Sequence, residues 1–186
     1  MLDDSRYTVP QACDGVSGLA WLRASVARFS EGPAHARRRA LIDDLLAGSV
    51  VLREPGGDPT VALLRGVGLP DGLLPDVELA AAAYQPHAPQ SPEADRAADR
   101  LVDACGSRDE VTAAKVCVLL QAHAATRALI EKLRAGDGGP PVPTTRRIAP
   151  TGVEVEVDLS DAPFGRGRHA CPGAQLARLL AEAALR

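Results

Sequence analysis

Aromatic residues are scarce in this chain, at 3% of its 186 residues. A hydrophobic core must therefore be built from leucine, valine and alanine, as is typical of helical proteins. The net charge is −3, so no basic excess is present to recruit nucleic acid or an anionic membrane. The four cysteines show no Cys-x-x-Cys spacing, which argues against structural zinc or a disulfide framework. They are Cys13, Cys105, Cys117 and Cys171.

Targeting and membrane signals are lacking as well. The chain starts Met-Leu-Asp-Asp-Ser-Arg, without the basic segment and apolar run of a secretory signal. No apolar run reaches the length needed to span a bilayer, about 20 residues. We expect a soluble cytoplasmic protein that folds as a single domain over residues 1–186, because this length suffices for one hydrophobic core.

What the sequence does have is apolar residues at helical spacing. Helices are predicted over residues 16–29, 34–46, about 75–84 and 92–105. Residues 49–73 contain Pro-Gly turns around a short apolar run at 61–67, and we expect mainly loop there. The longest signal begins at Ser107, which is predicted to form a capping box with Glu110, and ends near Arg134. Its middle is apolar nearly all round, so it should be a buried central helix.

A short hairpin is predicted after this helix. In the first strand, alternation puts Arg146 and Arg147 on opposite faces, so only one of them can reach the interior. The run Val153–Val157 alternates strictly, as in a half-buried strand, and follows a turn at 150–152. The predicted fold class is therefore mainly α with a small β hairpin, built around a long central helix.

The segment Phe164–Gly173 has the most distinctive composition. Three glycines, one histidine and one cysteine fall within these ten residues, immediately before an apolar helical run that we expect to start at Pro172. A helix N-terminus lowers the pKa of a nearby thiol, and glycines allow a flat ligand to approach the backbone. Cys171 is thus placed to be a thiolate, and a thiolate is one of the ligands by which proteins hold haem iron.

These ten residues resemble the haem-binding loop of the cytochrome P-450 family, Phe-x-x-Gly-x-His/Arg-x-Cys-x-Gly, with every fixed position filled. The resemblance implies haem b with Cys171 as the axial ligand of the iron. It also implies that His169 meets a haem propionate and that Phe164 packs near the thiolate. Gly165 and Gly173 complete the part of the loop that would contact the cofactor.

Other segments resemble the family in the same order along the chain. His35 and Arg39 lie one helical turn apart, as in the His-x-x-x-Arg pair of the family's helix C that reaches the propionates. Arg147 matches an Arg-x-Ala strand whose arginine binds a propionate. The fold implied is a reduced cytochrome P-450-like fold, since family members are roughly twice as long. Tyr84 and His87 would border the substrate pocket, or would be a helix-capping tyrosine and a loop histidine.

The central helix resembles the family's helix I but departs from its distal signature, Ala-Gly-x-Glu/Asp-Thr-Thr. This chain has Gln121-Ala122-His123-Ala124-Ala125-Thr126. One register puts Ala124 at the acid and Ala125 at the threonine; the other keeps Thr126 as the alcohol with Ala125 at the acid. The carboxylate that helps to deliver protons for dioxygen cleavage is absent in both registers.

Two residues of this stretch are candidate catalytic groups, His123 and Thr126. His123 would act as a distal acid/base or a sixth iron ligand, or would face another helix. The letters Glu131-Lys132-Leu133-Arg134 match the family's Glu-x-x-Arg, but they end the central helix and we interpret them as coincidental.

The expected function is that of a haem-thiolate enzyme of bacterial specialised metabolism. Peroxide-driven oxidation or redox-neutral haem chemistry would fit the altered distal motif better than ordinary monooxygenation. The alternatives are a non-catalytic relative that activates a partner enzyme, a haem-based sensor, or a conventional monooxygenase despite that motif. Expected partners are a small-molecule substrate, a ferredoxin-type donor or peroxide, and a second copy of the chain in a homodimer, with neither nucleic acid nor membrane.

Overall fold

The computed structural model describes residues 1–48 and 57–186. In that part the chain is mostly helical with one two-stranded antiparallel sheet, which confirms the predicted fold class. The helices are α1 (Gly18–Ala24), α2 (Gly32–Gly48), α3 (Pro59–Gly66), α4 (Leu74–Ala82), α5 (Pro92–Ala104), α6 (Glu110–Arg134) and α7 (Ala174–Ala184). The strands are β1 (Thr144–Ile148) and β2 (Glu154–Asp158), and the 3₁₀ turns are η1 (Ala27–Phe29), η2 (Asp71–Leu73) and η3 (Gly167–His169).

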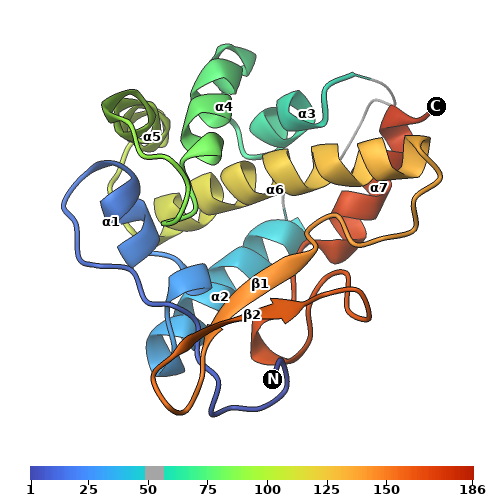
Figure 1. The fold of residues 1–186 in the computed structure, drawn as a ribbon. Helices are drawn as coiled ribbons and strands as arrows, with labels where there is room; N and C mark the ends of the chain where they lie inside the picture. The colour runs from blue at the N-terminus through green and yellow to red at the C-terminus, as the bar shows by residue number, and fades with distance from the viewer. Residues whose placement is uncertain (49–56) are drawn as a thin grey trace.

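Helix α6 is the axis of the molecule, as predicted. It packs against each of the other six helices, and Figure 1 shows it crossing the centre with α3, α4 and α5 on one side and α2, the hairpin and α7 on the other. Val116, Cys117 and Leu119 on α6 are fully buried. Burial stabilises this helix by about 25 cal/mol per Å² of apolar surface, chiefly over residues 112–120, nearly all of which are buried.

The expectation that no apolar run is long enough to span a bilayer was wrong. By length and composition alone α6 could do so, with a mean hydropathy of 1.2 in its most apolar window. In this fold 61% of that window is buried inside the protein. A core helix of a soluble protein meets the same test, so the length of α6 is weak evidence for a membrane.

Several predicted boundaries need correction. The helix predicted over 16–29 ends at Ala24, because Val26 is extended (φ −115°, ψ 156°), and the chain resumes as the separate turn η1. Residues 61–66 of the run 61–67, which was expected within a loop, belong to α3, and Val67 is its C-cap. The N-cap of α3, Asp58, accepts a hydrogen bond from the backbone N–H of Thr60. The loop predicted at 49–56 lies outside the described residues.

The predicted capping box of α6 is also wrong. Asp109 is the N-cap and accepts a hydrogen bond from the N–H of Thr112 at 2.8 Å. Ser107 donates its hydroxyl to the Asp109 carboxylate instead. Glu110 pairs with Arg37 and Arg38 on α2, at 2.7 and 2.8 Å. The tertiary contact with α2 thus replaces the local one.

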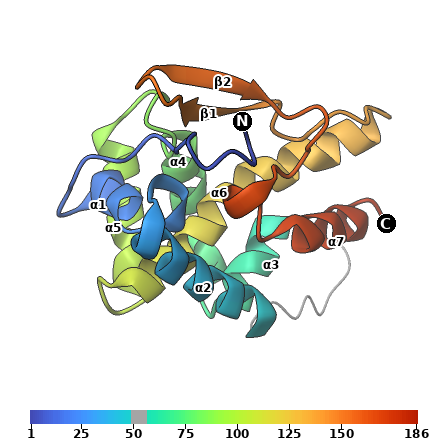
Figure 2. The ribbon, with the colours of Figure 1, turned by 90° about the horizontal axis from the view of Figure 1, so that it is seen from below.

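The hairpin forms as predicted, with Arg147 opposite Val155. Arg147 points inward and is 4% exposed, whereas Arg146 lies on the outer side and pairs with Glu154. On the other side of β1, Thr8 forms a bridge with Ile148 through two backbone hydrogen bonds. Figure 2 shows this N-terminal segment running along the hairpin.

Candidate functional site

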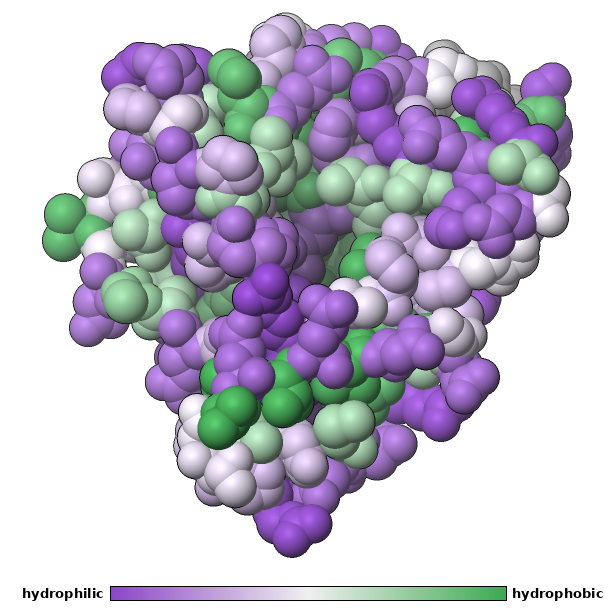
Figure 3. Space-filling view, viewed as in Figure 1, coloured by the Kyte–Doolittle hydropathy of each residue, from purple (hydrophilic) through white to green (hydrophobic). Residues whose placement is uncertain are grey.

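A cavity of about 320 Å³ opens between α6, α2, α7 and the hairpin. Figure 3 shows the hollow in this face of the molecule, below α6. Its volume is at the lower end of the range for small-molecule sites, about 300–1,000 Å³. All eight residues predicted to bind a cofactor line it: His35, Arg39, Arg147, Phe164, Gly165, His169, Cys171 and Gly173. They come from three separate segments of the chain.

The Cys171 loop is shaped by its glycines. The N–H of Cys171 donates to the carbonyl of Phe164 at 2.7 Å and closes the loop. Gly165 and Gly167 have φ of +70° and +68°, which residues with a side chain rarely adopt. Gly173 is different, because its φ is −92° and an added Cβ would meet no described atom within 4 Å. The protein itself does not require glycine there, but a flat ligand lying on the loop would.

The thiol of Cys171 faces this cavity. Cys171 is exposed as a residue, but partial burial of its thiol raises the pKa, and the backbone N–H of Gly173 and the charges of Arg39 and Arg28 only partly oppose this. The predicted lowering of the thiol pKa is therefore wrong for the protein without a ligand, and α7 begins at Ala174 rather than Pro172. A metal ion that binds a thiol deprotonates it directly, so this pKa does not disfavour a metal ligand.

Helix α2 supplies the next two residues. Arg39 donates from Nη1 to the carbonyl of Ala170 at 2.8 Å and so ties α2 to the Cys171 loop. Its Nε pairs with Asp43 at 2.9 Å. The rings of His35 and His169 lie with their centroids 4.2 Å apart. Burial lowers the pKa of both histidines, that of His169 to about 4 with added repulsion from His35, so both are neutral near pH 7.

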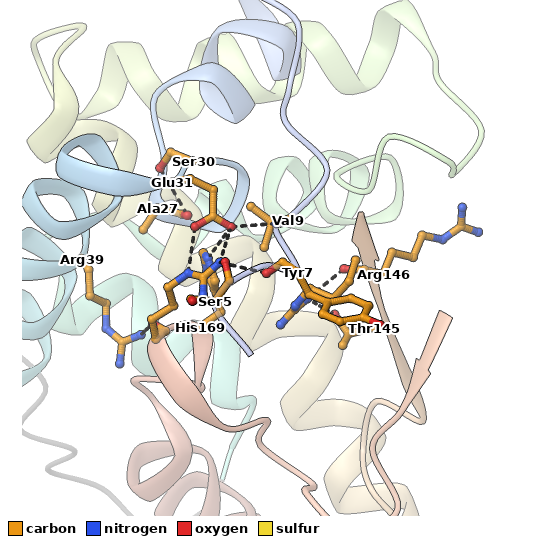
Figure 4. Close-up of polar contacts among 12 residues, drawn as sticks. Ser5, Tyr7, Val9, Ala27, Ser30, Glu31, Arg39, Thr145, Arg146 and His169 are labelled. Carbon is orange, nitrogen blue, oxygen red and sulfur yellow. Dashed lines mark hydrogen bonds and ion pairs between the residues drawn. The ribbon is translucent and has the colours of Figure 1, made fainter. Parts of the chain in front are cut away.

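Glu31, which sequence reasoning overlooked, lies behind His169 (Figure 4). Its carboxylate accepts hydrogen bonds from the N–H of Val9 at 2.8 Å, from Arg168 at 2.8 Å and from His169 Nε2 at 3.2 Å. Burial alone would raise the pKa of Glu31, but these bonds outweigh it and lower the pKa. An ionised carboxylate only accepts, so Nε2 of His169 carries its hydrogen. Glu31 thus orients the ring of His169.

Arg147 is a buried cation that lacks an acidic partner among the described residues. Its Nη1 donates to Thr145 Oγ1 at 3.0 Å and to the carbonyl of Arg146 at 2.8 Å. Burial lowers its pKa and repulsion from Arg28 lowers it further, while the charge of Glu31, which forms no ion pair with Arg147, partly opposes both. A buried guanidinium without an ion-paired acid is costly. An anionic group in the cavity would relieve this cost.

The two candidate catalytic residues of α6 face different parts of the structure. His123 does not line the cavity; it faces α3, where its Nδ1 bonds with Thr60 Oγ1 at 2.8 Å. Burial lowers the pKa of His123, and Arg127 adds repulsion. Thr126 does line the cavity and is 1% exposed. Within residues 1–48 and 57–186, Thr126 Oγ1 is the one buried side-chain polar atom without a hydrogen-bond partner.

Both candidate alcohol positions of the distal motif, Ala125 and Thr126, line the cavity, so the lining is compatible with either register. Thr126 offers a hydroxyl to the cavity, while Ala124 and Ala125 line it with methyl groups. No aspartate or glutamate lines the described part of the cavity, as expected from either register. The hydroxyl of Thr126 is therefore present without a neighbouring acid.

Three further residues line the cavity that the sequence did not assign to the site: Tyr84, Gln121 and Arg28. Tyr84 lines the cavity and bonds through its hydroxyl with Cys117 Sγ at 3.4 Å, whereas His87 is exposed and does not line it. Gln121 also lines the cavity and donates to the same sulfur at 2.8 Å. Arg28 could not be found by periodicity, because it falls inside the helix predicted over 16–29 and the break at Ser25 turns it toward the cavity.

These features fit a flat dianionic cofactor such as haem. Arg147 lacks a counter-charge, Gly173 leaves room beside the loop, and a lone thiol faces the same space as an unpartnered hydroxyl. Among the described residues no three histidine, cysteine, aspartate or glutamate side chains cluster as a metal site. One protein ligand is enough for an iron that a porphyrin already holds.

Solved structures of known proteins resemble this chain in fold. No protein-family model matches the chain, and no curated protein does. Among solved structures, the chain resembles P450BioI in complex with a hexadec-9Z-enoic acid ligated acyl carrier protein, with a TM-score of 0.68, 17% identity, and coverage of 99% of this chain and 80% of that one. It also resembles CxnD, a cytochrome P450 enzyme for C–S bond formation in chuangxinmycin biosynthesis, with a TM-score of 0.59, 18% identity, and coverage of 98% and 75%. The chain has a cytochrome P450-like fold.

Proposed function

We propose that this chain, with its cytochrome P450-like fold, binds haem b in the cavity with Cys171 as the axial thiolate ligand. One observation carries the proposal: the fold gathers all eight residues of the predicted cofactor set around a single cavity. These residues come from three segments of the chain, residues 35–39, 147 and 164–173. A cofactor that contacts all three segments would account for the meeting of these residue types around one space.

Each residue then has a role. Arg147 and Arg39 are donors for the propionates of haem, because a guanidinium suits a carboxylate. His35 and His169, whose rings lie against each other, would meet the same carboxylates. His169 would donate to one only with a second proton on Nδ1, because its Nε2–H is bound to Glu31. Gly165 and Gly173 leave space for the porphyrin plane, and Phe164 shields the thiolate side. Glu31 holds His169 in place from behind.

The reaction follows from what faces the other side of the cavity. Haem with a thiolate ligand supplies oxidative and one-electron chemistry. Thr126 provides one hydroxyl that can hold or pass a proton, but no acid lines the described cavity to resupply it. His123 is turned toward Thr60 and cannot take that part. We infer peroxide-driven oxidation or redox-neutral chemistry on a small apolar substrate, rather than reductive monooxygenation.

The setting we infer is bacterial specialised metabolism. Of the two structural neighbours, one is described as forming a C–S bond in a biosynthetic pathway and the other is bound to an acylated carrier protein. Both descriptions name a small organic molecule, hexadec-9Z-enoic acid or chuangxinmycin. A small organic substrate also agrees with the apolar lining of this cavity by residues such as Val118, Leu129 and Leu176.

The test of haem binding is an absorbance titration of the purified chain with haem, followed by reduction and addition of carbon monoxide. We expect a Soret band typical of thiolate ligation in the wild type and its loss in Cys171→Ser. Cys13→Ser is the matched control, because Cys13 is exposed like Cys171 but does not line the cavity. A wild type that binds no haem, or a Cys171→Ser spectrum like that of the wild type, would refute the proposal.

The reaction class is tested on the haem-loaded protein. Turnover of a model substrate should be supported by hydrogen peroxide and not by a ferredoxin and ferredoxin reductase with NADPH. Ordinary rates with the reductase system would show a conventional monooxygenase instead. Wild-type biological function in Cys171→Ser, together with co-purification of another enzyme, would indicate the alternative role as a non-catalytic activator.

A further inference from the structure

Residues 2–9, called the strap below, run outside the cofactor cavity and line no part of it. They contain no helix and only the single bridge at Thr8. Val9 is the one buried residue among them, so the strap is held mainly by hydrogen bonds rather than by apolar packing. Segments with few buried apolar contacts and exposed hydrogen bonds are those that open most readily in a folded protein.

The strap is hydrogen-bonded to two walls of the cavity. Thr8 exchanges two backbone hydrogen bonds with Ile148 of β1, at 3.1 and 2.8 Å. The N–H of Val9 donates to the carboxylate of Glu31 at 2.8 Å, and Glu31 directly precedes α2. One short segment thus joins the hairpin to the start of α2 from outside the cavity.

The third wall, the loop that carries the thiol, is held by the same segment. Arg168 of this loop donates to the carbonyl of Tyr7 at 2.8 Å and to Glu31 at 2.8 Å. Gly167 has a φ of +68°, and a Cβ added there would come within 2.6 Å of the carbonyl oxygen of Leu2. Figure 4 shows the strap beside Glu31. All three segments that supply the predicted cofactor set are therefore bonded to the strap.

Haem in this cavity would contact all three walls, so it enters or leaves when they move apart. Because the strap is bonded to every one of them, the walls separate only after it is released. We propose that the strap is a latch on the cofactor cavity, and that haem is exchanged through a minor state in which residues 2–9 are detached. The inference rests on the proposed function, because it takes haem as the ligand.

Two measurable rates depend on this open state. The N–H of Val9 exchanges with solvent when its bond to Glu31 opens, and haem dissociates through the same state. A substitution that weakens the strap should therefore raise both rates by the same factor. A residue that only positions a haem contact would raise haem dissociation and leave the exchange of Val9 unchanged.

Arg168→Met weakens the strap at the loop, because it removes the bonds that tie the loop to the strap and to Glu31. It should raise Val9 exchange and haem dissociation about tenfold each, as expected for the loss of a charge-assisted hydrogen bond. Arg6→Met is the matched control. Arg6 also has an ion pair of 2.8 Å, but with Asp4 inside the strap, so both rates should change less than about twofold.

Thr8→Pro weakens the strap at the hairpin instead. Proline has no N–H to donate to Ile148. The substitution leaves the bonds of Glu31 to Arg168 and His169 in place, so it does not alter what orients His169. Both rates should rise by a common factor of about three to ten, as expected for the loss of one hydrogen bond.

Exchange of the Val9 N–H is followed by NMR, and haem dissociation by transfer to a scavenger protein. Amides of α6 are the reference for global unfolding and should exchange as in the wild type. The latch is refuted if either strap variant releases haem faster without a matching rise at Val9, or if Val9 exchange rises while haem dissociation is unchanged. An equal acceleration of the α6 amides would refute it too, since the whole fold would then be opening.

A wild type that binds no haem would contradict the proposed function, and the strap is then tested on the haem-free protein. The reporter is the N–H of Cys171, which closes the loop by donating to the carbonyl of Phe164 at 2.7 Å. In Thr8→Pro its exchange should rise together with that of Val9. An unchanged rate at Cys171 would show that the strap does not hold the loop and would overturn the inference.

Discussion

Replacing Arg147 with methionine should separate the effect of this buried cation on protein stability from its contribution to haem binding. Arg147 is 4% exposed and has no described acidic partner. In the haem-free protein, methionine removes a desolvation cost of several kcal/mol. It also removes two hydrogen bonds from a charged donor, to Thr145 Oγ1 and to the carbonyl of Arg146, worth about 1.5–3 kcal/mol each. The terms offset to within about 2 kcal/mol, so Tm should stay within about 8 °C of the wild type.

Haem binding should respond much more strongly. Loss of an Arg–carboxylate hydrogen bond of about 1.5–3 kcal/mol lowers affinity by about 10- to 100-fold. Arg147→Lys should fall between the wild type and Arg147→Met, because it keeps the charge but loses the planar fork.

Haem affinity is measured by absorbance titration, and the Tm of the haem-free protein by circular dichroism. The control is Arg146→Met, the next residue on the opposite face of the strand, which should change neither quantity. The reasoning fails if Arg147→Met binds haem as the wild type does, or if Arg146→Met weakens haem equally. It also fails if Arg147→Met is unfolded without haem, since the buried cation would then be stabilising the structure.

Three further variants test other parts of the site. Glu31→Gln should speed haem dissociation, measured by transfer to a scavenger protein, because His169 and Arg168 lose a charged acceptor; an unchanged rate would show that Glu31 does not position His169. Thr126→Val should leave the Tm of the haem-free protein unchanged or raise it, because it removes a buried hydroxyl without a partner; a fall of several degrees would mean that the hydroxyl is satisfied. Glu110→Gln should lower the free energy of unfolding at pH 7 by less than about 1 kcal/mol, because the ion pairs of Glu110 with Arg37 and Arg38 are partly exposed. Arg37 lowers the pKa of Glu110 from 4.5 to about 2, helped by Arg38, so this contribution is present above pH 4.5 and lost as the pH falls toward 2; a difference from the wild type that persists at pH 2 would contradict the assignment.

Burial and side-chain direction were predicted correctly where they depend only on the hydrophobic period of one helix or strand. The central helix is apolar on every face, so it had to be buried whatever surrounds it, and its end at Arg134 is confirmed. Alternation in β1 correctly put Arg147 and Arg146 on opposite faces. Both results depend only on the geometry of one element.

Boundaries and caps were predicted less well, because they depend on contacts between elements. The side chain of Glu110 could reach back to Ser107 or across to Arg37 and Arg38, and two guanidinium groups outweigh one local bond. The break after Ala24 is of the same kind. The hydrophobic period continues through Ser25, so nothing in the local pattern indicates that the chain turns there.

The candidate site likewise combines features that the sequence predicts with features that only the tertiary structure shows. The sequence alone supplied the thiol loop, the His35–Arg39 pair, Arg147 and the missing distal acid, through its resemblance to motifs of the cytochrome P450 family. Only the tertiary structure decided that Thr126 faces the cavity while His123, three residues earlier on the same helix, faces Thr60 on α3. It alone shows that Arg28 and Arg147 share a cavity whose described lining has no acid. Charge balance is a property of what surrounds a group in space, and no spacing along the chain encodes it.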